Sequence, residues 1–99
     1  MKYGGCVYFV TNKSHKVLYL GVTSDLQRRI SEHREHLLKG SFSDRYNTEK
    51  LVYYEWFDRI ESAISREKEL KKWRRKKKEQ LINSMNPEWK DLWEEVKEW

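Results

Sequence analysis

The chain has 99 residues, of which 37% are hydrophobic, 14% aromatic and 37% charged. This length supports one domain with one modest core and excludes two independent domains. The excess of 21 Lys and Arg over 16 Asp and Glu gives a net charge of +5, which favours a polyanionic partner such as nucleic acid.

Cysteine content and hydropathy exclude further classes. Cys6 is the only cysteine, so neither an intramolecular disulfide nor a cysteine-based zinc site can form. No stretch approaches the ~18 apolar residues of a membrane span, and the first residues lack the apolar segment of a signal peptide. We therefore expect a soluble, cytoplasmic protein with no membrane partner.

Two strands are predicted near the N-terminus, over residues 6–11 and 17–22, with a polar turn between them. A hairpin centred on residues 13–14 would place Tyr8 directly opposite Tyr19 on one face of the sheet. A bulge would make the two tyrosines diagonal neighbours instead. Either arrangement keeps both phenols close together.

A helix is predicted over residues 24–38, with Ser24 and Gln27 at the spacing of a capping box and Gly40 as its stop. A polar loop over residues 40–49 follows. The inward stripe of this helix consists of Leu26, Ile30, His33 and Leu37.

A third strand is predicted over residues 51–57, followed by a helix over 58–80 that Asp58 would cap together with Glu61. Glu67 falls within the apolar stripe of this second helix, which is formed by Ile60, Ala63 and Ile64, with Leu70 at its edge. A carboxylate facing a core costs several kcal/mol unless it is paired or bound to a metal. Glu67 is therefore either part of a site or a helix-end partner of an arginine.

A last amphipathic helix is predicted over residues 86–99, with Asn86 as cap and Pro87 in its first turn. We expect it to pack on the same domain, which would span residues 1–85. The alternative is a surface for a homodimer or a protein partner. The stripe that needs covering consists of Trp89, Leu92, Trp93, Val96 and Trp99.

Polar groups are expected to converge on one face of the sheet. Arg29 and His33 are one turn apart on the first helix and look toward the sheet, whereas Arg28 points toward solvent or a ligand's backbone. Together with the two tyrosines and Glu67, they form a constellation of two phenols, a guanidinium, an imidazole and a carboxylate.

This constellation suits phosphodiester hydrolysis. Glu67 would hold a divalent cation, Mg²⁺ or alternatively Mn²⁺, and Arg29 would bind a phosphate oxygen. A tyrosine would orient or deprotonate the attacking water. Because no second carboxylate stands near Glu67, one metal ion with water ligands is favoured over two. Taken singly, each side chain could instead be structural.

A basic run on the second helix is the predicted nucleic-acid surface. Such cations bind phosphates without reading sequence, so DNA would be recognised by shape or backbone. The alternative is a solvated helix face. The predicted phosphate contacts are Arg28, Lys71, Lys72, Arg74, Arg75, Lys76, Lys77 and Lys78.

These residues resemble the GIY-YIG nuclease superfamily, particularly its small single-domain bacterial members. The second half-motif is Tyr19-Leu20-Gly21, whereas the first keeps only its tyrosine, in Cys6-Val7-Tyr8. The segments 18–30, 65–75 and 86–89 extend the likeness over nearly the whole chain.

The resemblance implies an active site of Tyr8, Tyr19, Arg29, His33 and Glu67, with one Mg²⁺ on the glutamate. The first half-motif lacks its glycine and isoleucine. A late asparagine of larger members could correspond to Asn83 or Asn86.

We therefore predict an α/β domain with a small, mainly antiparallel three-stranded sheet flanked by helices, plus the C-terminal helix. The predicted function is a metal-dependent DNA endonuclease in DNA repair, recombination or processing. The alternatives are a non-catalytic nucleic-acid-binding module, or a protein-interaction domain using Trp89, Trp93 and Trp99.

Overall fold

The computed structural model describes residues 4–35 and 47–99. The expected helix stop at Gly40, the inward Leu37 and most of the polar loop therefore lie outside the described residues. None of the described helices is long and apolar enough to cross a lipid bilayer.

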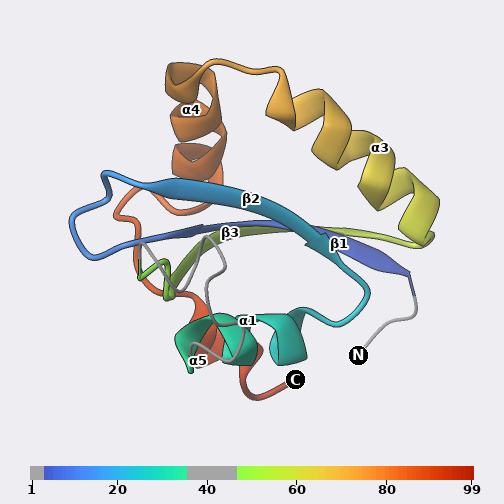
Figure 1. Ribbon diagram of the computed structural model, residues 1–99, viewed down its shortest axis with the longest axis horizontal. Coiled ribbons are helices and arrows are strands. Elements are labelled where there is room, and N and C mark those ends of the chain that lie inside the picture. The colour runs from blue at the N-terminus through green and yellow to red at the C-terminus, as the bar shows by residue number, and fades with distance from the viewer. Residues whose placement is uncertain (1–3, 36–46) are drawn as a thin grey trace.

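Three antiparallel strands form the sheet, in the order β2-β1-β3. They are β1 (Gly5–Thr11), β2 (Leu18–Thr23) and β3 (Lys50–Phe57), close to the predicted ranges. Every residue of β1 is buried because this strand has a neighbour on each side and helices on both faces (Figure 1). The predicted α/β fold with a small antiparallel sheet is confirmed.

The hairpin register differs from the predicted one by two residues. Tyr8 lies opposite Gly21, and Tyr19 lies opposite Val10, so the two tyrosines are diagonal neighbours. The predicted direct pairing is wrong because the turn is longer than a tight hairpin. The Asn12 side chain closes this turn by accepting hydrogen bonds from two backbone amides further along, at 3.0 and 3.2 Å. A shift of two residues keeps every side chain on its predicted face.

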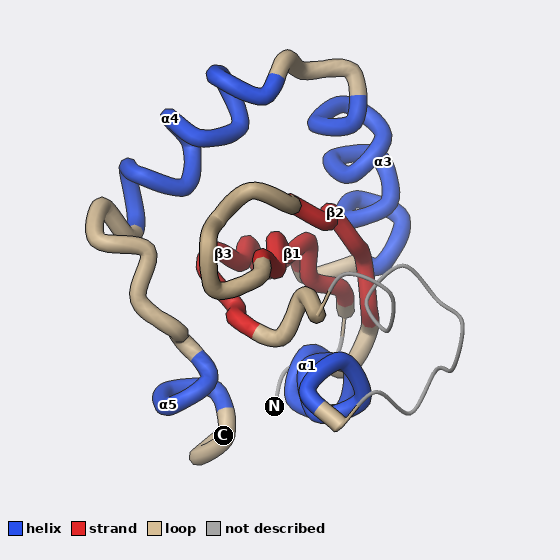
Figure 2. Tube along the Cα trace, turned by 60° about the vertical axis from the view of Figure 1, so that its left-hand side comes forward, coloured by secondary structure: helices blue, strands red, loops and turns tan. Residues whose placement is uncertain are grey.

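Helices cover both faces of the sheet (Figures 1 and 2). On one side lie α1 (Leu26–Arg34) and the short α5 (Trp93–Val96), and on the other side lie α3 (Ile60–Lys71) and α4 (Arg75–Met85). Because the side chains of β1 alternate between the two faces of the sheet, this strand contributes residues to two cores. Tyr8 belongs to the core under α1, and Phe9 belongs to the core under α3.

Neither predicted capping box forms, and each helix has its N-cap one residue later than predicted. Asp25, not Ser24, caps α1, and its carboxylate accepts a hydrogen bond from the Arg28 amide at 3.1 Å. At α3 the N-cap position is Arg59 rather than Asp58, and it makes no side-chain capping bond. Leu26, Ile30 and His33 are buried as the stripe on α1 predicts.

The predicted helix over 58–80 is two helices. The chain breaks at residues 72–74, where Arg74 is extended, with φ −70° and ψ 156°. A continuous helix over residues 58–80 would span about 35 Å, more than the 32 Å extent of the molecule. The break instead returns α4 to the sheet, where Ile82 is fully buried in the core.

The C-terminal segment also departs from the prediction, since its helix covers only Trp93–Val96. Asn86 ends α4 instead of starting a helix, and its side-chain amide donates to the Val52 carbonyl at 3.1 Å. The three tryptophans of the expected stripe lie apart. Trp89 stacks near His15 with ring centroids 5.0 Å apart, Trp93 lies under α1, and Trp99 contacts aromatic residues of β3.

Candidate active site

Three aromatic side chains form a cluster between α1 and the sheet. The Tyr8 hydroxyl and His33 Nε2 are 2.9 Å apart, within hydrogen-bonding distance. The Tyr19 ring lies 6.4 Å from the Tyr8 ring and 5.6 Å from the His33 ring. Thus one residue each from β1, β2 and α1 meet at one point, as their shared face predicts.

Gly21 makes room for this cluster. It lies opposite Tyr8, and a Cβ added at this position would be 2.4 Å from the phenol ring and its hydroxyl. Any side chain here would force the ring aside. The close approach of the Tyr8 ring therefore explains why the Tyr19-Leu20-Gly21 motif ends in glycine, and the sequence alone did not reveal this.

Arg29 borders the cluster, and Arg28 does not. The Arg29 guanidinium interacts with the Tyr8 phenol and favours its ionised form. It also pairs with Glu32, with 3.2 Å between Nε and Oε1. The Arg28 side chain is 77% exposed, as predicted for the outward position. Both arginines line a polar hollow of about 160 Å³ at the start of α1.

Burial sets the protonation of Tyr8 and His33. Burial, and after it the nearby Arg29 charge, lower the pKa of His33 to about 4, while Glu32 opposes the shift. Burial is also the main cause of the raised pKa of Tyr8, with Arg29 opposing it. At neutral pH the imidazole and this phenol are both neutral. One of the two can therefore donate the hydrogen bond that joins them while the other accepts it.

Glu67 lies on a helix that packs against the opposite face of the sheet. The expectation that all five polar groups converge on one face is therefore wrong, because α1 and α3 sandwich the sheet (Figure 1). The Glu67 side chain is only 12% exposed, consistent with its inward position in the stripe. Its partner is not an arginine but Lys71, with 2.9 Å between Nζ and Oε2.

The connection between the two faces runs around the edge strand β2. Helix α3 contacts β2 as well as β1, and Tyr19 stands on β2. The Tyr19 hydroxyl also contributes to the raised pKa of Lys71, after the larger effect of its hydrogen bond with Glu67. The Glu67–Lys71 pair thus lies on a helix that contacts the edge strand carrying Tyr19.

The donor set suits a single hard cation at most. In residues 4–35 and 47–99, no three His, Cys, Asp or Glu side chains gather to form a metal cluster. Glu67 supplies one shielded carboxylate, the ligand type that Mg²⁺ and Mn²⁺ accept when water and substrate oxygens complete the shell. The residues present therefore fit a one-metal site better than a two-metal one.

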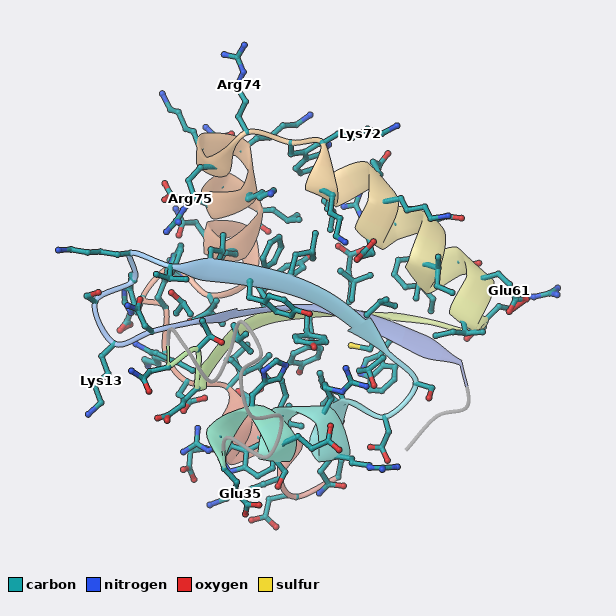
Figure 3. All side chains as sticks on the ribbon, viewed as in Figure 1. Lys13, Glu35, Glu61, Lys72, Arg74 and Arg75 are labelled. Carbon is teal, nitrogen blue, oxygen red and sulfur yellow. The ribbon has the colours of Figure 1, made fainter. Side chains whose placement is uncertain are left out.

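Some cations of the predicted basic run contact other parts of the protein, and others are exposed to solvent. Arg75 donates to the carbonyls of His15 and Lys16 at 2.7 and 3.0 Å, so it holds α4 to the β1–β2 hairpin. Lys77 lies over the Trp73 ring at 4.0 Å. By contrast, Lys72 and Arg74 extend into solvent at the junction of α3 and α4 (Figure 3).

A second polar network lies on the α3 face of the sheet. The Tyr53 hydroxyl donates to Glu55, and Arg66 donates to both oxygens of the same carboxylate, at 3.1 and 3.3 Å. Arg66 also stacks over Trp73, 5.3 Å from the ring centroid. The sequence did not single out this network because Glu55 stands on β3 and Arg66 on α3, eleven positions apart, so no local period links the two elements.

Comparisons with known proteins identify the class. The family model of the GIY-YIG catalytic domain matches residues 4–80, so the chain belongs to this family. The family is a nuclease superfamily whose members generally use divalent metals and bind DNA. The resemblance read from the motif residues is confirmed.

Similar proteins carry the name UPF0213. A UPF0213 protein, HQ_3675A of Haloquadratum walsbyi, is 39% identical over 74 residues, which cover 74% of this chain and 81% of that protein. A UPF0213 protein of Syntrophus aciditrophicus is 32% identical, covering 81% of this chain and 91% of the relative. The solution NMR structure of the UPF0213 protein BH0048 from Bacillus halodurans has a TM-score of 0.56 at 29% identity, covering 88% of this chain and 90% of that one.

Proposed function

We propose that this protein is a metal-dependent DNA endonuclease that hydrolyses phosphodiester bonds with one metal ion. The observation that carries the proposal is the cluster of Tyr8, Tyr19 and His33 beside Arg29. The phenols of Tyr8 and Tyr19, a neutral imidazole and a guanidinium are the groups that can orient water next to a bound phosphate. Membership of the GIY-YIG family supports the same reaction class.

Each side chain has a role in this proposal. Tyr19, which is half-buried, would contact the attacking water, and Tyr8 would position it through the network with His33. Arg29 would bind a non-bridging phosphate oxygen by charge-assisted hydrogen bonds. Glu67 would hold Mg²⁺ or Mn²⁺, which supplies positive charge to the phosphate and the leaving oxygen.

The proposed DNA contacts are those cations of the basic run that have no structural task. Lys72, Arg74 and Lys76 are exposed, and Arg28 offers a further positive charge beside the cluster. We exclude Arg75 from the proposed DNA contacts because its guanidinium donates hydrogen bonds to two carbonyls of the β1–β2 hairpin. These contacts recognise the phosphate backbone, so we propose a structure-directed role in DNA repair, recombination or processing.

The test compares wild type with Glu67→Gln on end-labelled single-stranded, duplex, flapped and four-way DNA, with Mg²⁺ or Mn²⁺ present. We expect metal-dependent nicking that falls below detection in the variant. Removal of a shielded charge should leave the fold intact, so the melting temperature without metal should not fall.

A binding-only protein would give a different pattern in the same experiment. Neither protein would cut any DNA, while both would bind DNA in a salt-sensitive manner. That result would replace the endonuclease proposal with the non-catalytic binding module.

A further inference from the structure

The Glu67–Lys71 ion pair differs from the other ion pairs of the described residues. The Glu67 side chain is 12% exposed, whereas the acidic partners of the other pairs range from 20% for Glu32 to 72% for Glu94. Exposed helix pairs contribute little to stability, about 0.3–0.5 kcal/mol. A carboxylate this shielded from water depends more strongly on its counter-ion.

The two partners are unequally held. The Lys71 side chain is 61% exposed, so its ammonium can swing into solvent by rotating about its own bonds. Glu67 sits on the inner side of α3 and cannot follow. Within the part of the chain that the structure describes, Lys71 is also the one charged partner of this carboxylate.

We infer that Lys71 is a resident counter-ion that occupies the metal-binding carboxylate in the metal-free protein and transfers to a DNA phosphate when a divalent cation binds. This inference rests on the proposed metal role of Glu67. A doubly charged cation on that carboxylate repels the ammonium, and the exposed lysine stem lets it leave. Lys71 stands on α3, which contacts the edge strand β2 that carries Tyr19, so a phosphate bound beside the aromatic cluster would lie on the side of the sheet edge that the freed ammonium can reach.

The exchange has two consequences. Lys71 weakens metal binding in the absence of DNA, because one positive charge must be displaced. It strengthens DNA binding only when metal is present, because only then is its ammonium available. Metal and DNA would therefore each favour the binding of the other.

The first test measures Mn²⁺ binding to the full chain by electron paramagnetic resonance, without any cleavage. The variants are Lys71→Met, which keeps the apolar stem, and Lys68→Met as the matched control, since Lys68 is exposed on the same helix and makes no ion pair with any described residue. We expect Lys71→Met to bind Mn²⁺ about tenfold more tightly than wild type. Lys68→Met should stay within about twofold, and Glu67→Gln should lose the site.

The second test measures DNA affinity against salt concentration, once in EDTA and once in Ca²⁺ as a non-productive cation. Lys71→Met should match wild type in EDTA and show a salt slope smaller by about 0.9 in Ca²⁺. The same slope difference in both conditions would show that Lys71 contacts DNA permanently and would overturn the inference.

Unchanged or weaker Mn²⁺ binding by a folded Lys71→Met or Lys71→Gln variant would also overturn the inference. The inference would equally fail if wild type and both of these Lys71 variants bound no Mn²⁺. Because these readouts need no turnover, they separate the inference from the proposed activity. A protein that exchanges Lys71 but cuts no DNA would support the inference and contradict the endonuclease proposal.

Discussion

The two faces of the sheet bury tyrosines in opposite ways. On the α3 face the Tyr53 hydroxyl donates to the Glu55 carboxylate, whose oxygens also bind Arg66. On the α1 face the Tyr8 hydroxyl meets the imidazole of His33. The first network is an ion pair with its charges matched inside the protein, and the second is composed of neutral groups beside a cation.

This difference separates structure from proposed chemistry. A carboxylate held by an arginine has its acceptors committed to the fold. A neutral phenol and imidazole can still exchange protons with a bound water or phosphate. Both tyrosines have a raised pKa, caused first by burial, so pKa alone would not distinguish them. The partner of each hydroxyl does.

The largest expected effect comes from removing the hydroxyl on the α1 face. Tyr8→Phe should reduce cleavage about 1000-fold, because the network with His33 is lost. Tyr53→Phe is the matched control and should leave cleavage within about threefold while reducing the free energy of unfolding by about 1 kcal/mol. Single-turnover cleavage and urea denaturation measure the two effects. Equal losses of cleavage would break the distinction between the faces.

The second prediction concerns the neighbouring arginines of α1. Arg29→Ala should slow cleavage about 100-fold because Arg29 borders the Tyr8 phenol. Arg28→Ala should reduce it by about threefold or less, since that side chain is 77% exposed. Initial rates at saturating DNA check this ratio. Comparable losses would show that the α1 face does not present Arg29 to the phosphate.

A pair of glycines on opposite faces gives the third prediction. A Cβ at Gly5 would lie 2.7 Å from the Ala63 Cβ on α3, and one at Gly21 would lie 2.4 Å from the Tyr8 ring. Each substitution by alanine should lower the free energy of unfolding by about 2 kcal/mol. Only Gly21→Ala should also lower the cleavage rate of the folded fraction, measured well below its melting temperature. A rate loss in both would mean that the α3 face is equally coupled to cleavage.

The smallest expected effect is a pH dependence of stability. The folded-state pKa of His33 is about 4, below the ordinary value of 6.5, so protons bind the unfolded chain preferentially between these values. The stabilisation is complete above pH 6.5 and is lost as pH falls toward 4, by about 2 kcal/mol. Urea denaturation at pH 7 and 4.5 measures it. His33→Gln should flatten this part of the profile, and an unchanged profile would contradict the burial-driven shift.

The sequence predicted the strands and the α1 stripe well because both depend on local periodicity. Alternation along β1 and the inward spacing of Leu26, Ile30 and His33 are set within a few residues. The register error kept each residue on its face because the shift was even. Thus the neighbourhood of Tyr8, Tyr19 and His33 was predictable despite the wrong pairing.

Errors concentrated where long-range packing competes with local pattern. The basic run is compatible with one continuous helix, yet the core requires Ile82 to return to the sheet, so the chain breaks at residues 72–74. Likewise the periodic tryptophans near the C-terminus suggest one helix. Hydrogen bonds from the Asn86 amide to Val52 and from the Leu92 amide to the Leu51 carbonyl instead tie that segment to β3.

By itself, the sequence determined the binary pattern of the sheet, the family and the inward position of Glu67, since these follow from residue identity and short spacing. Only the tertiary structure decided that α1 and α3 lie on opposite faces, that Lys71 pairs with Glu67, and that Arg75 holds the hairpin. The reason is physical. A helix period states which way a side chain points from its own axis, but the sheet face on which that helix packs depends on contacts between residues far apart in the chain.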